Sequence, residues 1–293
     1  MGTFGNSWEL TKLSFSVLRK DKEILLLPLI SGVFLILIWV LLFASIVGAM
    51  FLAPGVAAML FSPPVLYGWP VLLFILYVIS YFIVIYFNAA VIACAMIRLN
   101  GGDPTVRDGL QRANQHLGKI FAWALVSATI GLILQAISRR AGFAGRIAIW
   151  LIGVAWSVAT YFVVPVLIFE NEGAWGSLKK SANLFKNTFG TTMVSSIAMG
   201  LIFFGLALIG LVPLFFGIWA FISLNSVLGL IVGIAVAFVY WIIIACVSSA
   251  AQGVLVAALY RYATTGKIAP DFAPFHETLP RYTTAAGDGG KNW

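Results

Sequence analysis

Few residues in this chain of 293 residues have the type and spacing that chemistry requires. Those that could act on a lipid at a membrane surface are Asp103, Asp108, His116, Glu170 and Glu172. Carboxyl and imidazole groups serve as general acids and bases, so these five would carry the reaction of a lipid-modifying enzyme. Lys179 and Lys180 lie close enough in sequence to neutralise Glu170 and Glu172, and no nucleophile, base and oxyanion donor occur together. We therefore predict a non-catalytic protein.

A second group of polar residues lies inside long apolar stretches. It contains Asn88, Gln135, Ser248 and Gln252. Ser248 and Gln252 are four residues apart, so they share one face of a helix. These amides and hydroxyls either line a pore or form hydrogen bonds between helices, and the second role is the commoner one in membrane proteins.

The two cysteines indicate neither a metal site nor a disulfide framework. Cys94 and Cys246 are far apart in sequence, and no CxxC pair or histidine-rich spacing accompanies them. We predict that both are packing residues. The chain also lacks a glycine-rich phosphate-binding loop, so we predict no cofactor.

The composition indicates whether these residues are positioned by a protein surrounded by water or by one embedded in a lipid bilayer. Hydrophobic residues make up 61% of the chain and charged residues only 10%, whereas soluble domains are about 45–50% apolar and about 25% charged. No Asp, Glu, Lys or Arg occurs from Ile24 to Ile97 or from Thr191 to Tyr260. About 20 apolar residues cross a membrane as a helix, and the apolar runs do not alternate as barrel strands would. The sequence therefore predicts an all-α integral membrane bundle.

We expect one transmembrane domain over residues 1–260, followed by an extended tail over 261–293. Its six spans are predicted at about 24–50, 71–97, 120–138, 147–169, 191–218 and 227–260. Pro165 and Pro213 fall within two of these spans and are expected to kink them.

The basic residues predict the orientation of the spans. In membrane proteins, Lys and Arg in short loops concentrate on the cytoplasmic side. Of the 18 basic residues, all but Arg139, Arg140 and Arg146 fall in the N-terminal segment, the loops after the second and fourth spans, and the tail. We therefore predict that both termini are cytoplasmic. The net charge of +8 marks a face that attracts anionic lipid headgroups; no recognition motif points to nucleic acid.

Amphipathic segments precede the first, third and fifth spans. The segment DGLQRANQHLGKIFAWALVSA resembles GSLKKSANLFKNTFGTTMVSS, which pairs Leu110 with Leu178 and Phe121 with Phe189. An apolar arc opposite a basic arc is typical of a helix that lies in the headgroup plane. We predict three repeats of an interfacial helix followed by a transmembrane hairpin. The basic residues expected to bind lipid or a partner are Lys12, Arg19, Lys20, Arg112, Lys179 and Lys180.

Two stretches carry a family resemblance. The opening SWELTKLSFSVLRKDKEILLLPLISG and the exit LYRYATTGKIAP resemble an uncharacterised family of prokaryotic six-span membrane proteins, a domain of unknown function. The alternation of interfacial helices and hairpins is also similar to the membrane domain of some glycerophosphodiester phosphodiesterases, whose soluble catalytic domain this chain lacks. The resemblance implies a multi-pass protein of the prokaryotic cytoplasmic (plasma) membrane and no particular chemistry.

Three classes of function are compatible with these features. A scaffold or accessory subunit would bind anionic lipid, a membrane-protein partner or a second copy of the chain through its basic interfacial helices. A channel or facilitator for a small solute would use the polar residues within the spans, and a lipid-modifying enzyme would use the acidic residues named above. We favour the scaffold, because charged groups that transporters place within the membrane are missing from the two long apolar blocks.

Overall fold

The computed structural model describes residues 16–52, 55, 62 and 67–265. All the regular elements in this part of the chain are helices. The chain divides into two compact units: unit 1 holds residues 1–25, 94–105 and 183–293, and unit 2 holds residues 26–93 and 106–182. Helices α5 (Trp69–Leu99) and α10 (Ala174–Ile209) contribute residues to both units.

Six helical segments of the described residues are long and apolar enough to cross a membrane, which confirms the predicted fold class. They are Lys22–Phe51, Trp69–Leu99, Leu117–Arg140, Phe143–Phe169, Thr192–Leu224 and Val227–Thr265. The shortest has 24 residues, more than the roughly 20 that cross the hydrocarbon core. Large apolar side chains stay exposed along them, as lipid contact allows; Phe43 is 69% exposed and Phe215 is 64% exposed.

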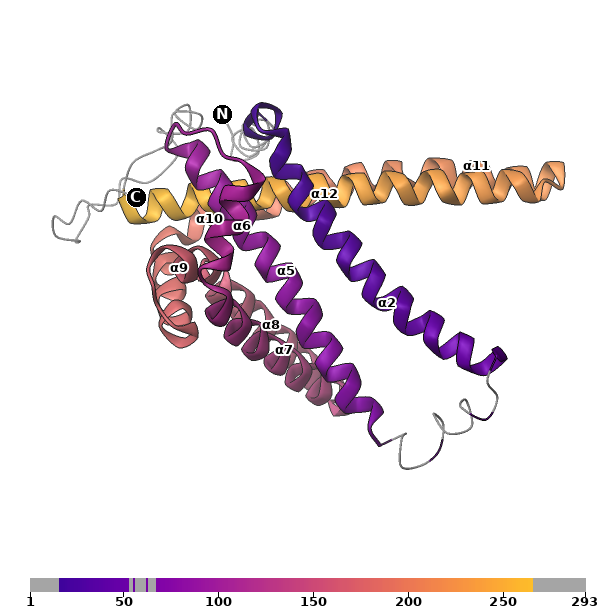
Figure 1. The fold of residues 1–293 in the computed structure, drawn as a ribbon, viewed down its shortest axis with the longest axis horizontal. Coiled ribbons are helices and arrows are strands. Elements are labelled where there is room, and N and C mark those ends of the chain that lie inside the picture. Colours follow the sequence, from indigo (N-terminus) through magenta and orange to yellow (C-terminus); the bar gives the residue numbers. More distant parts are fainter. Residues whose placement is uncertain (1–15, 53–54, 56–61, 63–66, 266–293) are drawn as a thin grey trace. The chain divides into compact units, whose positions relative to one another are not determined.

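Unit 2 is held together by ring contacts between helices. It contains α2 (Leu26–Leu52), most of α5, α6 (Val106–Asn114), α7 (Leu117–Arg140), α8 (Phe143–Thr160), α9 (Val163–Phe169) and the first turns of α10. The α7 and α8 helices lie side by side (Figure 1), where Trp123 stacks on Trp156 with ring centroids 5.8 Å apart. Phe82 of α5 meets Phe121 of α7 edge to face at 5.9 Å. Aromatic pairs therefore join α5, α7 and α8.

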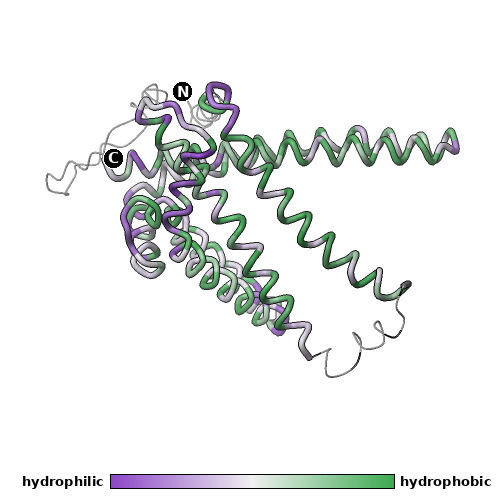
Figure 2. The backbone as a smooth tube through the Cα atoms, in the orientation of Figure 1, coloured by the Kyte–Doolittle hydropathy of each residue, from purple (hydrophilic) through white to green (hydrophobic). Residues whose placement is uncertain are grey.

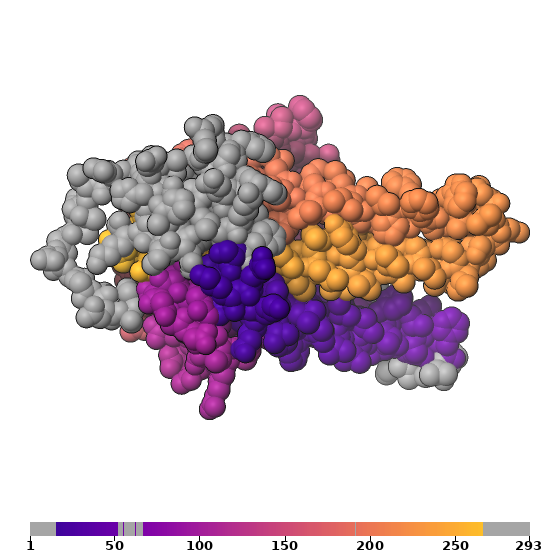
Figure 3. Space-filling model, turned by 90° about the horizontal axis from the view of Figure 1, so that it is seen from above, coloured from indigo at the N-terminus to yellow at the C-terminus, as the bar shows by residue number. Residues whose placement is uncertain are grey.

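Unit 1 contains a long antiparallel hairpin of α11 (Leu211–Leu224) and α12 (Val227–Thr265), preceded by the second part of α10. The two helices touch along most of the hairpin (Figures 1 and 3). Glycines allow this approach: a Cβ added at Gly233 would lie 2.6 Å from the Cα of Gly217. Asn225 makes the turn in the left-handed conformation, with φ 49°. The GxxxG pair Gly229 and Gly233 is thus a packing surface within the hairpin.

Helix breaks within the fourth and fifth spans coincide with the two prolines. Proline has no N–H to donate to the carbonyl four residues earlier, which is Ile209 for Pro213 and Tyr161 for Pro165. The α10 helix ends at Ile209, and the break between α8 and α9 falls at Tyr161 and Phe162. Each proline is therefore preceded by an interruption of the helix, about one turn earlier.

Several boundaries differ from the prediction. The fifth span reaches Leu224, and α12 continues to Thr265, so residues 261–265 of the expected tail are helical. The segment before the third span is the separate helix α6, whereas the segment before the fifth is the start of the uninterrupted α10. At the end of α6 the His116 N–H donates to the Ala113 carbonyl at 3.0 Å instead of to the Arg112 carbonyl, and the His116 ring Nδ1 lies 3.0 Å from that Arg112 oxygen. Residues 1–15 and 266–293 lie outside the described residues.

Candidate functional site

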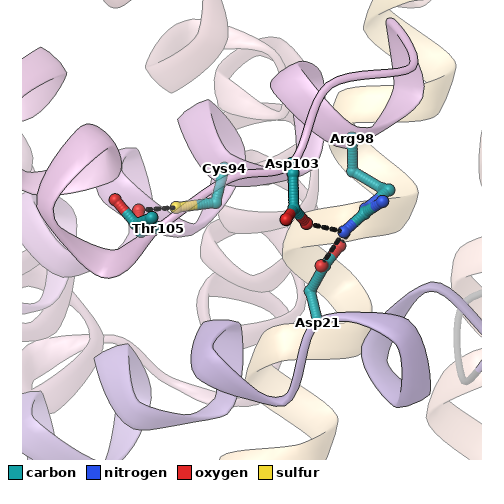
Figure 4. Close-up of polar contacts among 5 residues, drawn as sticks. All are labelled: Asp21, Cys94, Arg98, Asp103 and Thr105. Atoms are coloured by element: carbon teal, nitrogen blue, oxygen red, sulfur yellow. Dashed lines mark hydrogen bonds and ion pairs between the residues drawn. The ribbon is translucent and has the colours of Figure 1, made fainter.

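A connected group of charges among the described residues of unit 1 is centred on Arg98, near the C-terminal end of α5 (Figure 4). Its guanidinium group forms ion pairs with Asp21 and with Asp103. The Asp21 side chain is 3% exposed and the Asp103 side chain is 91% exposed. Arg98 therefore joins a buried carboxylate to one that faces solvent.

A glycine turn brings Asp103 back to Arg98. Gly101 has φ +88°, a conformation that glycine adopts without the steric cost that a Cβ adds. The Gly101 N–H donates to the Arg98 carbonyl at 2.9 Å, and the Gly102 N–H donates to the Ile97 carbonyl at 3.0 Å. The turn thus satisfies carbonyls that the end of α5 leaves free. Cys94 donates from its Sγ to the Thr105 carbonyl at 3.4 Å, which fixes the far end of the same loop (Figure 4).

A second arginine binds the same helix end. Arg261, in the last turns of α12, donates from its guanidinium to the Leu99 carbonyl. A cation at a helix C-terminus is also favoured by the helix dipole. Sequence reasoning missed Arg98 and Arg261, although each is the first charged residue after one of the two charge-free blocks.

In unit 1, the predicted lipid-binding residues follow a buried apolar pair. Val17 is 0% exposed and Leu18 is 3% exposed, whereas Arg19 and Lys20 are exposed. Lys12 lies outside the described residues.

In unit 2, two of the predicted basic residues contact the end of α9. Lys180 forms an ion pair with Glu170, whose side chain is 7% exposed. The Arg112 guanidinium lies over the Phe169 ring, 5.4 Å from its centroid, and its buried Nε has no hydrogen-bond partner among the described atoms. Lys179, beside Lys180, is exposed. The predicted set therefore contains both exposed cations and cations engaged within the fold.

The four polar residues predicted for a pore or for contacts between helices fall in both units. Asn88 on α5 is half-buried and Gln135 on α7 is exposed, and both belong to unit 2. In unit 1, Gln252 donates from Nε2 to Ser248 Oγ at 3.3 Å, a bond within α12. The predicted shared face of Ser248 and Gln252 is thus present.

Cations engage two of the acidic candidates. Asp103 pairs with Arg98, and Glu170 with Lys180, while Glu172 is exposed and Asp108 lies half-buried in the first turn of α6. Within the described ranges, no three His, Cys, Asp or Glu side chains lie close enough to hold a metal ion. The arrangement of these carboxylates is suited to linking segments of the chain electrostatically.

Comparison with known proteins identifies a family. No curated protein matches the chain, and no solved structure matches it. The matching family is described as a family of unknown function, DUF6159, and the match covers residues 67–270, more than half of the sequence. This range includes five of the six spans, the Arg98 turn and Arg261. The chain belongs to the family DUF6159.

Proposed function

We propose that this protein is a non-catalytic integral membrane scaffold or accessory subunit. The basic side of the segments that precede its spans binds anionic lipid headgroups. The same side binds a membrane-protein partner or a second copy of the chain, either directly or through the bound lipid. The observation that carries the proposal is the division of each such segment into a buried apolar or small side and an exposed basic side.

The division recurs in three places. Before the first span, buried Val17 and Leu18 precede exposed Arg19. In α6, which is strongly amphipathic, Gly109 and Ala113 are buried and Arg107 is exposed.

The start of α10 has the same character, since Ser181 and Phe185 are buried while Lys179 and Lys186 are exposed. The separate helix α6 has the apolar and basic sides of a helix that lies in the membrane interface. The α10 helix continues without a break into the fifth span, so its exposed lysines lie near the end of that span, where each Lys or Arg close to an anionic surface adds roughly 1 kcal/mol of attraction.

The proposal includes a location and an orientation. Exposed cations flank the spans on the side predicted to be cytoplasmic, where anionic lipids attract them. We place the protein in the prokaryotic cytoplasmic membrane with both termini in the cytoplasm, and we assign it no nucleic-acid partner.

The experiment compares lipid binding by charge variants of the full chain. The protein is purified in neutral detergent and titrated with phosphatidylglycerol, and native mass spectrometry counts the bound lipids. R19Q/K179Q should bind fewer lipids than the wild type, and R19K/K179R, which keeps the charges, should bind as many. Unchanged binding by R19Q/K179Q would contradict the proposal.

One observation favours a channel as the second candidate. Gln252 is an exposed amide within the apolar α12, and its Nε2 already uses Ser248 Oγ as an acceptor. Such a polar face could line a path for a small solute between copies of the chain. Altered solute flux through Q252A in vesicles, with unchanged assembly, would support that candidate.

A further inference from the structure

The turn between α7 and α8 carries a group of arginines that the proposed function does not use. Arg139 and Arg140 end α7, Ala141 and Gly142 form the connection, and Arg146 lies in the first turn of α8. All three arginine side chains are exposed. Figure 2 shows polar residues at this turn, next to the apolar lengths of both helices.

These arginines have no carboxylate nearby in sequence to neutralise them. No Asp or Glu occurs from Ile120 to Phe169. Among the described residues, none of the three guanidinium groups takes part in a hydrogen bond or ion pair. The turn is therefore a patch of three exposed positive charges without a counter-charge among the described residues.

The length of α7 places this patch at a membrane surface. Its 24 residues span about 36 Å at about 1.5 Å per residue, which exceeds a hydrocarbon core of about 30 Å. The turn therefore lies one membrane thickness from α6, at the opposite end of α7. Arginines at such a helix end extend toward the phosphates of the nearer leaflet.

Aromatic side chains on α8 set the depth of the turn. Phe143 is 83% exposed and Trp150 is 66% exposed, and with Arg146 and Ile147 they lie on one side of the helix. Tryptophan is enriched at the boundary between headgroups and acyl chains. This side thus offers apolar groups to the acyl chains and a guanidinium group to the headgroups.

We propose that the basic turn formed by Arg139, Arg140 and Arg146 binds the phosphate headgroup of an anionic phospholipid, in the leaflet opposite the one that the interfacial segments contact. Guanidinium groups recognise phosphate by paired N–H donors. The basic turn and the segments before the spans then hold the protein to anionic lipid at both surfaces of the membrane.

The test uses the full chain in liposomes that contain a phosphatidylglycerol with a photoactivatable diazirine in its headgroup. After illumination, mass spectrometry maps the modified peptides. Labelling of the peptide containing residues 139–150 should fall about ten-fold or more in R139Q/R140Q/R146Q, because three surface charges are lost. It should stay unchanged in the control R107Q/K186Q, which removes exposed charges at the other end of the spans.

Two further measurements make the result decisive. A phosphatidylcholine with the same photoactivatable group should label the peptide weakly in wild-type protein, since it lacks a net negative charge. All variants should elute from a sizing column as the wild type does, which shows that they fold. Equal labelling by the two lipids, or equal labelling of the wild type and the triple variant, would overturn the proposal.

Discussion

Arg98, at the end of the second span, forms an ion pair with Asp21, which precedes the first span and has a side chain only 3% exposed. The pair joins residues 77 positions apart in sequence. Removing one member of a buried pair is costly because the other charge remains without compensation. The Asp21–Arg98 pair is therefore expected to stabilise unit 1 more than its exposed neighbour Asp103 does.

Asp21→Asn should lower the free energy of unfolding by roughly 2–4 kcal/mol, because Arg98 then loses its buried counter-charge. Asp103→Asn removes an exposed carboxylate and should cost less than about 1 kcal/mol. Unfolding by SDS in mixed micelles measures both. Equal losses of unfolding free energy in the two variants would show that the burial of Asp21 does not increase its contribution to stability.

Gly233→Ala should destabilise the α11–α12 hairpin by roughly 1–3 kcal/mol. The added Cβ would lie 2.6 Å from Gly217 Cα and 2.7 Å from the Pro213 carbonyl oxygen, which are backbone atoms that cannot move aside. The control is Gly200→Ala, since a Cβ at Gly200 meets no atom within 4 Å. Thermal unfolding of the detergent-solubilised protein compares them, and a tolerated Gly233→Ala would contradict the close packing.

Tyr240→Phe should destabilise the protein by about 0.6–1.7 kcal/mol. The Tyr240 hydroxyl donates to the Leu206 carbonyl at 2.7 Å, near the break between α10 and α11. Gly210 donates its N–H to Ala207 at 3.1 Å instead of to Leu206, so the tyrosine satisfies a carbonyl that the helix releases. Tyr67→Phe is the matched control, because Tyr67 is 83% exposed. The same unfolding assay applies, and similar stabilities for both variants would argue against this role.

Loss of charge at the neighbouring lysines Lys179 and Lys180 should change two different properties, lipid binding and stability. Lys180→Gln leaves the nearly buried Glu170 carboxylate without this cation and should lower stability by roughly 1–3 kcal/mol. Lys179→Gln changes an exposed side chain and should lower phosphatidylglycerol binding with stability within about 0.5 kcal/mol of wild type. Thermal unfolding and lipid counting on the same samples separate the two effects. Lower stability of Lys179→Gln with unchanged lipid binding would show that Lys179 does not belong to the lipid-binding surface.

The six spans could be predicted because the membrane imposes length and polarity on each helix independently. The charge-free blocks from Ile24 to Ile97 and from Thr191 to Tyr260 each hold two spans. Proline effects are also local, so the breaks before Pro165 and Pro213 could be anticipated. The end of the sixth helix could not be predicted in this way, since no breaker stops α12 before Thr265.

The charge cluster could not be predicted in the same way, because it depends on tertiary structure. Nothing local relates Asp21 to Arg98, or Arg261 to the Leu99 carbonyl. The predicted repeat pairs Arg112 with Lys180, and both contact the end of α9, through Phe169 and Glu170 respectively. Sequence alone placed these two cations on the basic arc of a helix in the headgroup plane and could not distinguish them from Lys179.

The central claim, a scaffold that binds lipid or a partner, is tested most directly by native mass spectrometry of the protein extracted from its own membrane in lipid discs. We predict a stoichiometric second polypeptide, retained anionic lipid, or both. A homo-oligomer that carries neither would contradict the scaffold and favour the channel.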